Sequence, residues 1–417
     1  MRIVFYILVA GISAVVTFAL AVVIWKLSTK YRLYPKIRDR DVHTRPTPRL
    51  GGVAMFLGIV VAFVVASQLD SFSIVFNEPG KVLSIFGAAL IIVLIGVADD
   101  LWDLDWVTKL AGQFVAAGLL AWQGVQIVTL PIFGQTIFSS YVYLVLTVFA
   151  IVLVMNAINF IDGLDGLVAG VALIANGVFF VYTYVLQSSA ETDYFNLASL
   201  VSAVLIGACM GFLPLNFHPA KLFMGDAGAL LVGLLMAVSA LSVTGQVDPE
   251  AMSQPDQYTA SFVPAFIPIL LPFAVLVIPL LDFGLAMVRR LRAGKSPFSA
   301  DRKHLHHRLL DMGHSHLHAV LIFYAWTLVV SVGCLAYRFV PWYVATLFIV
   351  IGLIICTVAT LSPLSKRKAL EAVAQSSAPD DDARLVMDAR FDGLDAAADE
   401  NLLDAASSSH ETKEPTV

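Results

Sequence analysis

Long apolar runs recur along the whole chain, and they limit the folds that it can adopt. A run of about 20 apolar residues crosses about 30 Å of hydrocarbon as an α-helix, and a bilayer admits only helices and closed barrels. The sequence therefore predicts an all-α polytopic membrane protein. We expect eleven transmembrane helices, near residues 3–25, 51–68, 82–98, 109–123, 141–158, 166–186, 197–214, 227–244, 262–287, 319–337 and 342–361.

The composition supports this class. The 417 residues are 59% hydrophobic and 14% charged, whereas soluble domains are about 25% charged. The first apolar run extends to about Trp25 without a small-residue cleavage motif, so we interpret it as a spanning helix and not a signal peptide. The three cysteines lack CxxC spacing and are expected to be buried small hydrophobes. No general basic face for nucleic acid is present.

Lysine and arginine in the connections predict the orientation. Residues 26–50 carry eight of them and residues 289–318 carry seven, while the alternate connections are almost free of them. Basic loops lie on the cytoplasmic side of a membrane. We therefore expect the N-terminus outside and the C-terminus inside. Nearly every carboxylate and histidine that is a candidate for chemistry then lies in connections at the cytoplasmic face of the plasma membrane, which are 99–108, 159–165, 215–226 and 289–318.

The last part of the chain differs in composition from the rest. Residues 365–417 are rich in Ala, Ser and Asp and poor in aromatics, a composition typical of disordered segments. We predict an integral membrane domain over 1–364 and an acidic, disordered cytoplasmic tail over 365–417.

The first polar cluster is GVADDLWDLDWVTKLAGQ, with Asp99, Asp100, Asp103 and Asp105 at the inner end of the third predicted helix. Asp99 and Asp103 are four residues apart and would share a helix face. Carboxylates this dense repel one another unless a cation or a basic partner is present. The alternative is a solvated helix end with Lys109 as counter-ion.

The second cluster is NAINFIDGLDGLVAG, in which Asn156 and Asn159 precede Asp162 and Asp165. Glycines after both acids permit close backbone approach, and the N-terminus of the helix that follows favours anions. The pattern suits a polar ligand at a helix end. The two acids can instead be ordinary N-caps.

The third cluster is PLNFHPAKLFMGDAGALLVG, with Asn216, His218, Lys221, Phe223 and Asp226 before another apolar run. Asp226 lies between two glycines at a predicted helix start. Phe223, three residues earlier, can stack on a planar base. A lone Phe near a membrane end is also a common interfacial anchor.

The fourth cluster is GKSPFSADRKHLHHRLLDMGHSHLHA, with His304, His306, His307 and Arg308 in a basic loop. Histidines among Arg and Lys suit oxyanions, and no zinc-type spacing accompanies them, so we favour phosphate binding over zinc. Three further histidines without such company are expected in a loop or interface: His314, His316 and His318.

The four clusters combine hard oxygen ligands, glycine-flanked helix starts and a basic loop on one predicted face. These parts suit magnesium-assisted phosphoryl transfer, because Mg²⁺ prefers one or two carboxylates together with substrate phosphates. No P-loop or GxGxxG motif is present.

Taken in order, the motifs resemble those of the polyprenyl-phosphate N-acetylhexosamine-1-phosphate transferase family over about residues 43–310. They are HTRPTPRLGG, VADDLWDLDWVTKLAGQ, NAINFIDGLDGL, NFHPAKLFMGDAG and SPFSADRKHLHHRL. The form HLHHRL resembles the branch that uses UDP-N-acetylglucosamine. The stretch HTRPTPRLGGVAMFLG is similar to actinobacterial members, which adds decaprenyl phosphate to undecaprenyl phosphate as a candidate lipid, with the chain length left open.

The resemblance implies attack by the lipid phosphate on the sugar-bearing phosphorus of UDP-N-acetylglucosamine, the first membrane step of a surface polysaccharide pathway. It implies Mg²⁺, with Mn²⁺ as a possible substitute, and a possible homodimer in the bilayer. The implied catalytic and metal-binding acids are Asp99, Asp100 and Asp226, with Lys109 offsetting their charge. The implied substrate contacts are Asn159, Asp162, Asp165, Asn216, Phe223, His304, His306, His307 and Arg308.

Other assignments stay open at this stage. Asp282 matches a family acid of unassigned role and can instead pair with Arg289 or Arg290. His43, Arg45 and Arg49 are either substrate contacts or determinants of topology. One alternative function is the same chemistry with another UDP-N-acetylhexosamine. A second is a cation-coupled transporter, whose acids would line a route across the bilayer. A third is a CDP-lipid phosphatidyltransferase, but the DGxxAR run expected of that class is absent.

Overall fold

A computed structural model describes residues 2–31, 47–127, 139–189, 197–244, 262–292, 294 and 305–377. Within these residues every regular element is a helix. The all-α prediction is therefore confirmed for the described part of the chain.

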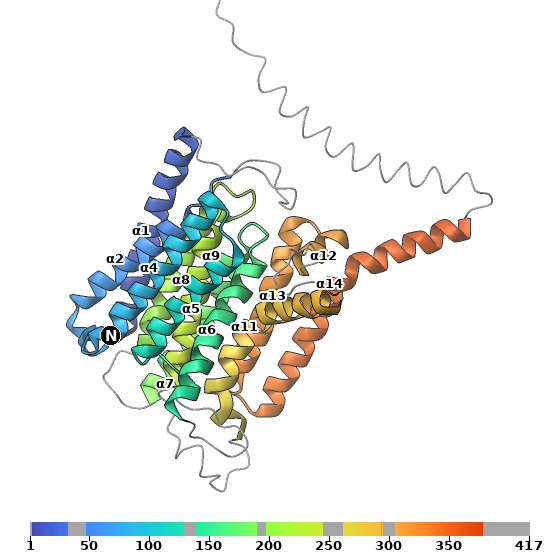
Figure 1. The fold of residues 1–417 in the computed structure, drawn as a ribbon. Coiled ribbons are helices and arrows are strands. Elements are labelled where there is room, and N and C mark those ends of the chain that lie inside the picture. The colour runs from blue at the N-terminus through green and yellow to red at the C-terminus, as the bar shows by residue number, and fades with distance from the viewer. Residues whose placement is uncertain are drawn as a thin grey trace, which may run out of the picture. The chain divides into compact units, whose positions relative to one another are not determined.

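The eleven predicted apolar segments coincide with eleven long helices of the described residues (Figure 1). These are α1 (Arg2–Tyr31), α2 (Gly51–Ser67), α4 (Pro79–Trp102), α5 (Trp106–Trp122), α6 (Ser140–Ile161), α7 (Leu167–Ser189), α8 (Leu197–Asn216), α9 (Gly225–Thr244), α11 (Phe262–Arg292), α13 (His316–Ala336) and α14 (Trp342–Ser377). The short elements are η1 (Asp70–Phe72), α3 (Ser73–Phe76) and α12 (Leu305–Asp311).

Eight helices in the described residues are long and apolar enough to cross a membrane, or nine if α2 and the segment Asp70–Phe76, bent by 100° against it, form one span. The chain is thus a multi-pass membrane protein. Helices α2 and α5 have 17 residues each, about 26 Å at 1.5 Å per residue. The count of eleven spans and the orientation of the termini stay predictions.

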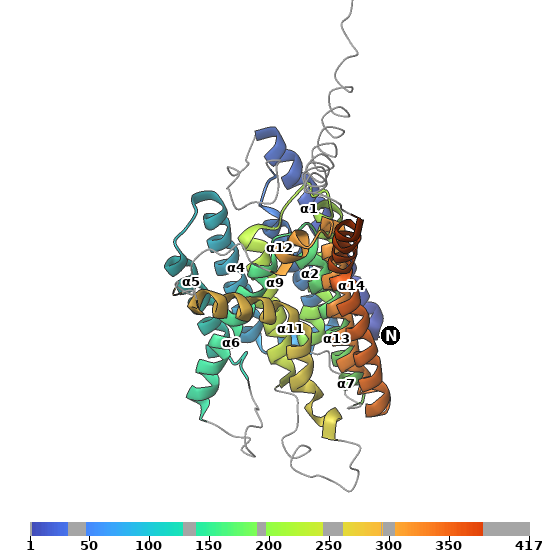
Figure 2. The ribbon, with the colours of Figure 1, turned by 90° about the vertical axis from the view of Figure 1, so that its right-hand side faces the viewer.

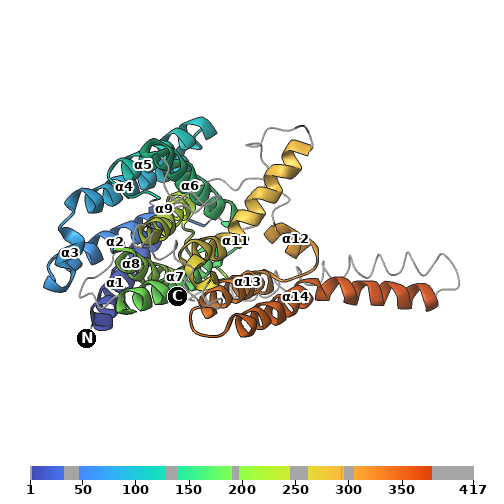
Figure 3. The ribbon, with the colours of Figure 1, turned by 90° about the horizontal axis from the view of Figure 1, so that it is seen from below.

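Helix α9 is at the centre of the unit Met1–Thr360. It packs against α2, α4, α6 and α8, and 83% of its apolar span is buried. Seen from below, α1 and α2 lie on one side of it and α11 and α13 on the other (Figure 3). Helix α11 changes direction along its length (Figure 2); interior prolines such as Pro279 remove helical hydrogen bonds and so permit a bend.

The C-terminal part differs from the sequence expectation. The unit Leu361–Val417 begins within α14, which stays helical to Ser377. The stretch SKRKALEAVAQSS was expected to be disordered from Ser365, but its Ala, Leu, Lys and Glu residues are good helix formers. The boundary at 364/365 stays a prediction, and the rest of the tail lies outside the described residues.

Small residues let α2 and α4 approach the start of α9 at backbone distance. A Cβ atom on Gly52 would lie 2.2 Å from the Gly228 nitrogen, and one on Gly96 would lie 2.2 Å from Ala227 Cα. Neither contact can relax by moving a side chain alone. These glycines therefore fix the position of the residue that precedes Ala227, which is Asp226.

We predict that Gly52→Ala will lower the unfolding temperature of the detergent-purified protein, because overpacking of this kind costs roughly 1–3 kcal/mol. The matched control is Gly177→Ala in α7, where a Cβ would meet nothing within 4 Å, so Ala should be neutral or slightly stabilising. Equal unfolding temperatures for the two variants would show that α2 and α9 are not in close contact.

Candidate functional site

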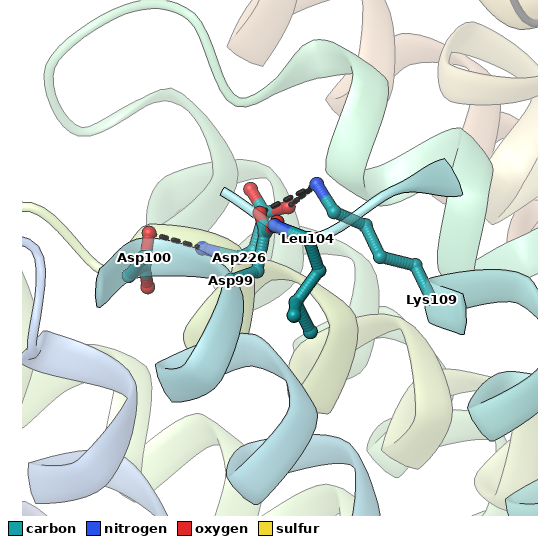
Figure 4. A network of polar contacts seen from close by, with 5 residues as sticks. All are labelled: Asp99, Asp100, Leu104, Lys109 and Asp226. Atoms are coloured by element: carbon teal, nitrogen blue, oxygen red, sulfur yellow. Dashed lines mark hydrogen bonds and ion pairs between the residues drawn. The ribbon is translucent and has the colours of Figure 1, made fainter. Parts of the chain in front are cut away.

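Lys109 lies between two carboxylates from different helices (Figure 4). Its Nζ is 2.5 Å from Asp99 Oδ2 and 3.2 Å from Asp226 Oδ2. Asp99 is in the last turn of α4, Lys109 in the first turn of α5, and Asp226 in the first turn of α9. Lys109 therefore lies beside the acids, where the sequence placed it as the residue that offsets their charge.

The turn between α4 and α5 sets this geometry. Asp103 ends α4 in the left-handed conformation, with φ of 54°, and its N–H donates to the Asp99 carbonyl. The Leu104 N–H donates to Asp99 Oδ1 at 2.8 Å. The expected shared face of Asp99 and Asp103 is therefore wrong, because the helix stops at Asp103.

Asp105 begins the next helix. Its carboxylate accepts hydrogen bonds from the Thr108 N–H at 3.0 Å and the Thr108 hydroxyl at 2.6 Å. These bonds hold the pKa of Asp105 below its usual value. As an N-cap, Asp105 fixes the first turn of α5 and with it Lys109, one residue beyond Thr108.

Asp100 contacts the start of α9. Its Oδ1 accepts a hydrogen bond from the Asp226 N–H at 3.4 Å, and its buried Oδ2 has no hydrogen-bond partner among the described residues. Gly225 has φ of +67°, and a Cβ there would lie 2.2 Å from Asp100 Oδ2. Glycine is therefore required at this position. The positive charge of Arg49 also acts on Asp100.

Two distant motifs pair through their backbones beside this cluster. The Gly51 N–H donates to the Phe223 carbonyl at 3.0 Å, Gly52 donates to Met224 at 2.9 Å, and the Phe223 N–H donates to Pro48 at 2.8 Å. The pairing fixes the loop that carries Phe223 and leads into α9. Sequence reasoning missed it, and the Gly-Gly pair at the start of α2 was its available signal.

Of the two acids in the second motif that were predicted to contact the substrate, one is buried and the other is exposed. Asp165 is buried, and its Oδ2 accepts hydrogen bonds from His218 Nδ1 at 2.8 Å and the Ala220 N–H at 3.0 Å. The His218 ring stacks on His316 with centroids 5.4 Å apart. Asp162, by contrast, is exposed at the end of α6.

Asn216 is also buried in hydrogen bonds. Its side-chain oxygen accepts from the Gly166 N–H and its amide donates to the Leu222 carbonyl, both at 3.1 Å. Asn216 thus ties the α6–α7 loop to the loop before α9. The interaction places the NFIDGLDGL and NFHPAKLFMGDAG motifs side by side.

Helix α6 adds two asparagines to the site. The Asn159 side chain lies beside the Asp226 carboxylate and interacts with it. One turn earlier, the Asn156 amide donates to Gln113 of α5. The predicted substrate contact Asn159 therefore reaches the acid cluster directly.

The fourth motif is described only in part. His304, His43 and Arg45 lie outside the described residues, and of His306 and His307 only the helical backbone of α12 is described. Arg308 is exposed. The α12 backbone is held at its start by Asp282, whose Oδ1 accepts from the Leu305 N–H at 2.8 Å.

The three later histidines have separate surroundings. His316 stacks on His218, as described above, and was missed as a neighbour of the site. His314 Nε2 donates to the Thr360 carbonyl at 2.9 Å, and His318 Nδ1 lies 2.6 Å from the Ser315 hydroxyl. His314 thus joins the segment before α13 to α14, and His318 lies against the N-cap residue of α13.

The clustered carboxylates are the candidate ligands for a metal ion in this site. Among the described residues no group of three or more His, Cys, Asp or Glu side chains is arranged so that it could hold a metal ion by itself. Mg²⁺ needs only one or two carboxylates when substrate phosphates complete its shell. The Asp99, Asp100 and Asp226 carboxylates, with the unbonded Asp100 Oδ2, fit that requirement.

We predict that Lys109→Met will lower the unfolding temperature by several degrees, because Asp99 and Asp226 then lose their shared cation. Millimolar Mg²⁺ should restore part of the loss, since it can replace the ammonium charge. The control is Lys81→Met, whose pair with Glu78 is exposed and worth little. If Lys109→Met unfolds at the same temperature as the wild type, Lys109 does not stabilise the acid cluster.

The chain is similar in sequence to known proteins over most of its length. The model of Glycosyl transferase family 4 matches residues 82–244. Decaprenyl-phosphate N-acetylglucosaminephosphotransferase of Mycobacterium leprae is 38% identical over 375 residues, which are 87% of this chain and 91% of the relative. A probable undecaprenyl-phosphate N-acetylglucosaminyl 1-phosphate transferase of Bacillus subtilis is 30% identical, over 82% of this chain and 88% of the relative.

A third relative extends the comparison. Undecaprenyl-phosphate alpha-N-acetylglucosaminyl 1-phosphate transferase of Escherichia coli is 29% identical over 78% of this chain and 83% of its own length. The family match, over residues 82–244, includes Asp99, Lys109 and Asp226. The chain belongs to glycosyl transferase family 4, which confirms the resemblance drawn from its motifs.

Proposed function

We propose that the chain transfers N-acetylglucosamine-1-phosphate from UDP-N-acetylglucosamine to a polyprenyl phosphate. The single observation that carries the proposal is the convergence of Asp99, Lys109 and Asp226 from three helices, in a chain whose relatives are named for this reaction. The product would begin a cell-wall or surface polysaccharide at the cytoplasmic face of the plasma membrane.

The acceptor is proposed to be decaprenyl phosphate. The relatives named for decaprenyl phosphate reach 38–39% identity, against 29–30% for those named for undecaprenyl phosphate. Undecaprenyl phosphate remains the alternative, because a prenyl tail contributes repeated apolar contacts that change little with one added unit.

The proposed reaction is one displacement at phosphorus. An oxygen of the lipid phosphate forms a bond to the sugar-bearing phosphorus of the donor. The bond from this phosphorus to the oxygen bridging to the uridine-bearing phosphate breaks, and UMP leaves with that oxygen. Because the lipid phosphate already supplies the nucleophilic oxygen, the balance of atoms needs no covalent intermediate on an aspartate.

Two neighbouring side chains are assigned to the anionic reactants. Lys109 would offset negative charge as the two phosphates approach, which a preorganised cation does without reorientation. Asp99 would position the lipid phosphate or accept its proton. Both carboxylate oxygens of Asp99 interact with a donor, one with the Lys109 ammonium and the other with the Leu104 N–H. Binding of the substrate would replace the Lys109 contact with a phosphate contact.

A magnesium ion would be held by Asp226 with Asp99 or Asp100, and Mn²⁺ would serve as a substitute. When bound, the ion supplies charge neutralisation at the diphosphate. The carboxylates are suited to this because they are clustered against a cation, Lys109.

The nucleotide end is proposed to lie along the paired loops. Phe223 would stack on the uracil, and the exposed Asp162 would contact the nucleoside. Asp165 and Asn216 are engaged in buried hydrogen bonds. We therefore assign them a structural role: they would hold His218 and the loop before α9 in place against the ligand. Asn159, which lies beside Asp226, would join the nucleotide end to the acid cluster. His304, His306, His307 and Arg308 would contact the diphosphate.

The direct test is release of UMP by the detergent-purified protein. We expect UMP only when a UDP-sugar, decaprenyl or undecaprenyl phosphate and Mg²⁺ are all present. Replacing UDP-N-acetylglucosamine by other UDP-N-acetylhexosamines in the same assay identifies the donor. Absence of UMP with every sugar, from folded protein, would refute the proposal and favour the transporter or CDP-lipid alternatives.

We predict that Asp99→Asn and Asp226→Asn will each abolish transfer in protein that is still folded and inserted, because each removes a charge from the site. Asp103→Asn is the matched control from the same cluster. Asp103 is exposed with positive φ, and Asn tolerates that conformation. Normal turnover by either site variant would withdraw its assigned role.

We predict that Phe223→Leu will raise the KM for the UDP-sugar more than it lowers kcat, since stacking on uracil stabilises the bound ground state and the transition state alike. Steady-state kinetics with the donor varied measures both constants. The same KM as the wild type would argue against stacking.

A further inference from the structure

Asp282 is a buried carboxylate to which the proposed reaction gives no role. It lies in α11 with 2% of its surface exposed. Its Oδ1 accepts a hydrogen bond from the Leu305 N–H at 2.8 Å, across 23 residues of sequence. Leu305 is the first residue of α12. The carboxylate therefore contacts the start of a different helix.

Helix α12 depends on such contacts. It has seven residues, and helices this short are not stable in isolation. The first N–H groups of any helix lack partners within the helix, and a carboxylate there also favours the positive end of the helix dipole. Asp282 thus serves as a cap supplied by another helix. Buried Leu309 and the packing of α12 on α13 hold the opposite end.

The residues carried by α12 make its position relevant to the reaction. His306, His307 and Arg308 follow Leu305 directly, so a rotation or shift of α12 would move all three together. These are the side chains assigned to the donor's diphosphate. The Asp282 contact lies one residue before them.

Asp282 lies next to a residue that packs on α6. The neighbouring Phe283 ring packs edge to face on Phe160 of α6, with centroids 4.9 Å apart, and the Arg290 guanidinium lies 5.2 Å from the same ring. Asn159, next to Phe160, lies beside the Asp226 carboxylate and interacts with it. The part of α11 that carries Asp282 thus packs on the part of α6 that approaches Asp226.

We propose that Asp282 is a positioning residue that holds α12, and with it His306, His307 and Arg308, at a fixed place relative to the Asp226 carboxylate. It acts as a hydrogen-bond acceptor for the Leu305 N–H and not as a metal ligand or base. Its effect on the reaction rests on the proposed function, whereas its effect on α12 does not.

Substitutions at Asp282 separate these roles. Asn keeps an acceptor oxygen of the same reach and loses the charge, so Asp282→Asn should retain transfer within about 3-fold of the wild type. Asp282→Leu loses the acceptor and should raise the KM for UDP-N-acetylglucosamine by at least about 10-fold, with a smaller fall in kcat. Asp311→Asn, an exposed acid of α12, is the control and should be unchanged.

Hydrogen exchange supplies a readout that needs no activity. In the intact detergent-purified protein, peptides containing Leu305 should exchange faster in Asp282→Leu than in the wild type. Asp282→Asn and Asp311→Asn should both exchange at the wild-type rate. Unfolding temperature and gel filtration establish that the compared proteins are folded.

Two results would overturn the proposal. Loss of transfer in Asp282→Asn as complete as in Asp226→Asn would assign the charge, and hence a metal or proton role, to Asp282. Unchanged exchange at Leu305 in folded Asp282→Leu would refute the capping contact. If Asp282→Leu does not fold, the Asn variant decides between the roles. If the wild type releases no UMP, the proposed function fails while the exchange measurement still tests the contact.

Discussion

The ion pairs of Lys109 with Asp99 and Asp226 are the interaction on which the site depends. They join α4, α5 and α9, whose charged residues are up to 127 positions apart. Carboxylates brought together at low dielectric repel strongly unless a cation lies between them. Lys109 supplies that cation. The same arrangement is ready to exchange an ammonium contact for the phosphates and metal ion of the proposed reaction.

The packing around α9 makes this interaction possible. Gly52 and Gly96 bring two helices to backbone distance of Ala227, and Gly225 leaves room for the Asp100 carboxylate. Backbone pairing of the Pro48–Gly52 segment with the Phe223 loop holds the same helix start from the other direction. The acids are therefore positioned by close helix contacts, which small residues permit within membranes.

The sequence predicted the helices well because apolar runs of membrane length are a strong local signal. It also selected Asp99, Lys109 and Asp226, since charges beside such runs are conspicuous. It could not predict that Asp103 ends α4, that Asn216 and Asp165 are occupied by loop contacts, or that Asp282 caps α12. Each of these depends on a partner distant in sequence or on a turn conformation. Glycine pairs were the only local sign of the close contacts.

The most direct measurement of the central claim is binding of Mn²⁺, used as a paramagnetic probe for Mg²⁺, in the presence of UDP-N-acetylglucosamine. Electron paramagnetic resonance distinguishes free from bound ion. We expect Mn²⁺ to bind to the wild type and to Asp103→Asn, and not to folded Asp226→Asn. Binding to Asp226→Asn as tight as to the wild type would contradict the claim that the carboxylates around Lys109 form the cation and diphosphate site.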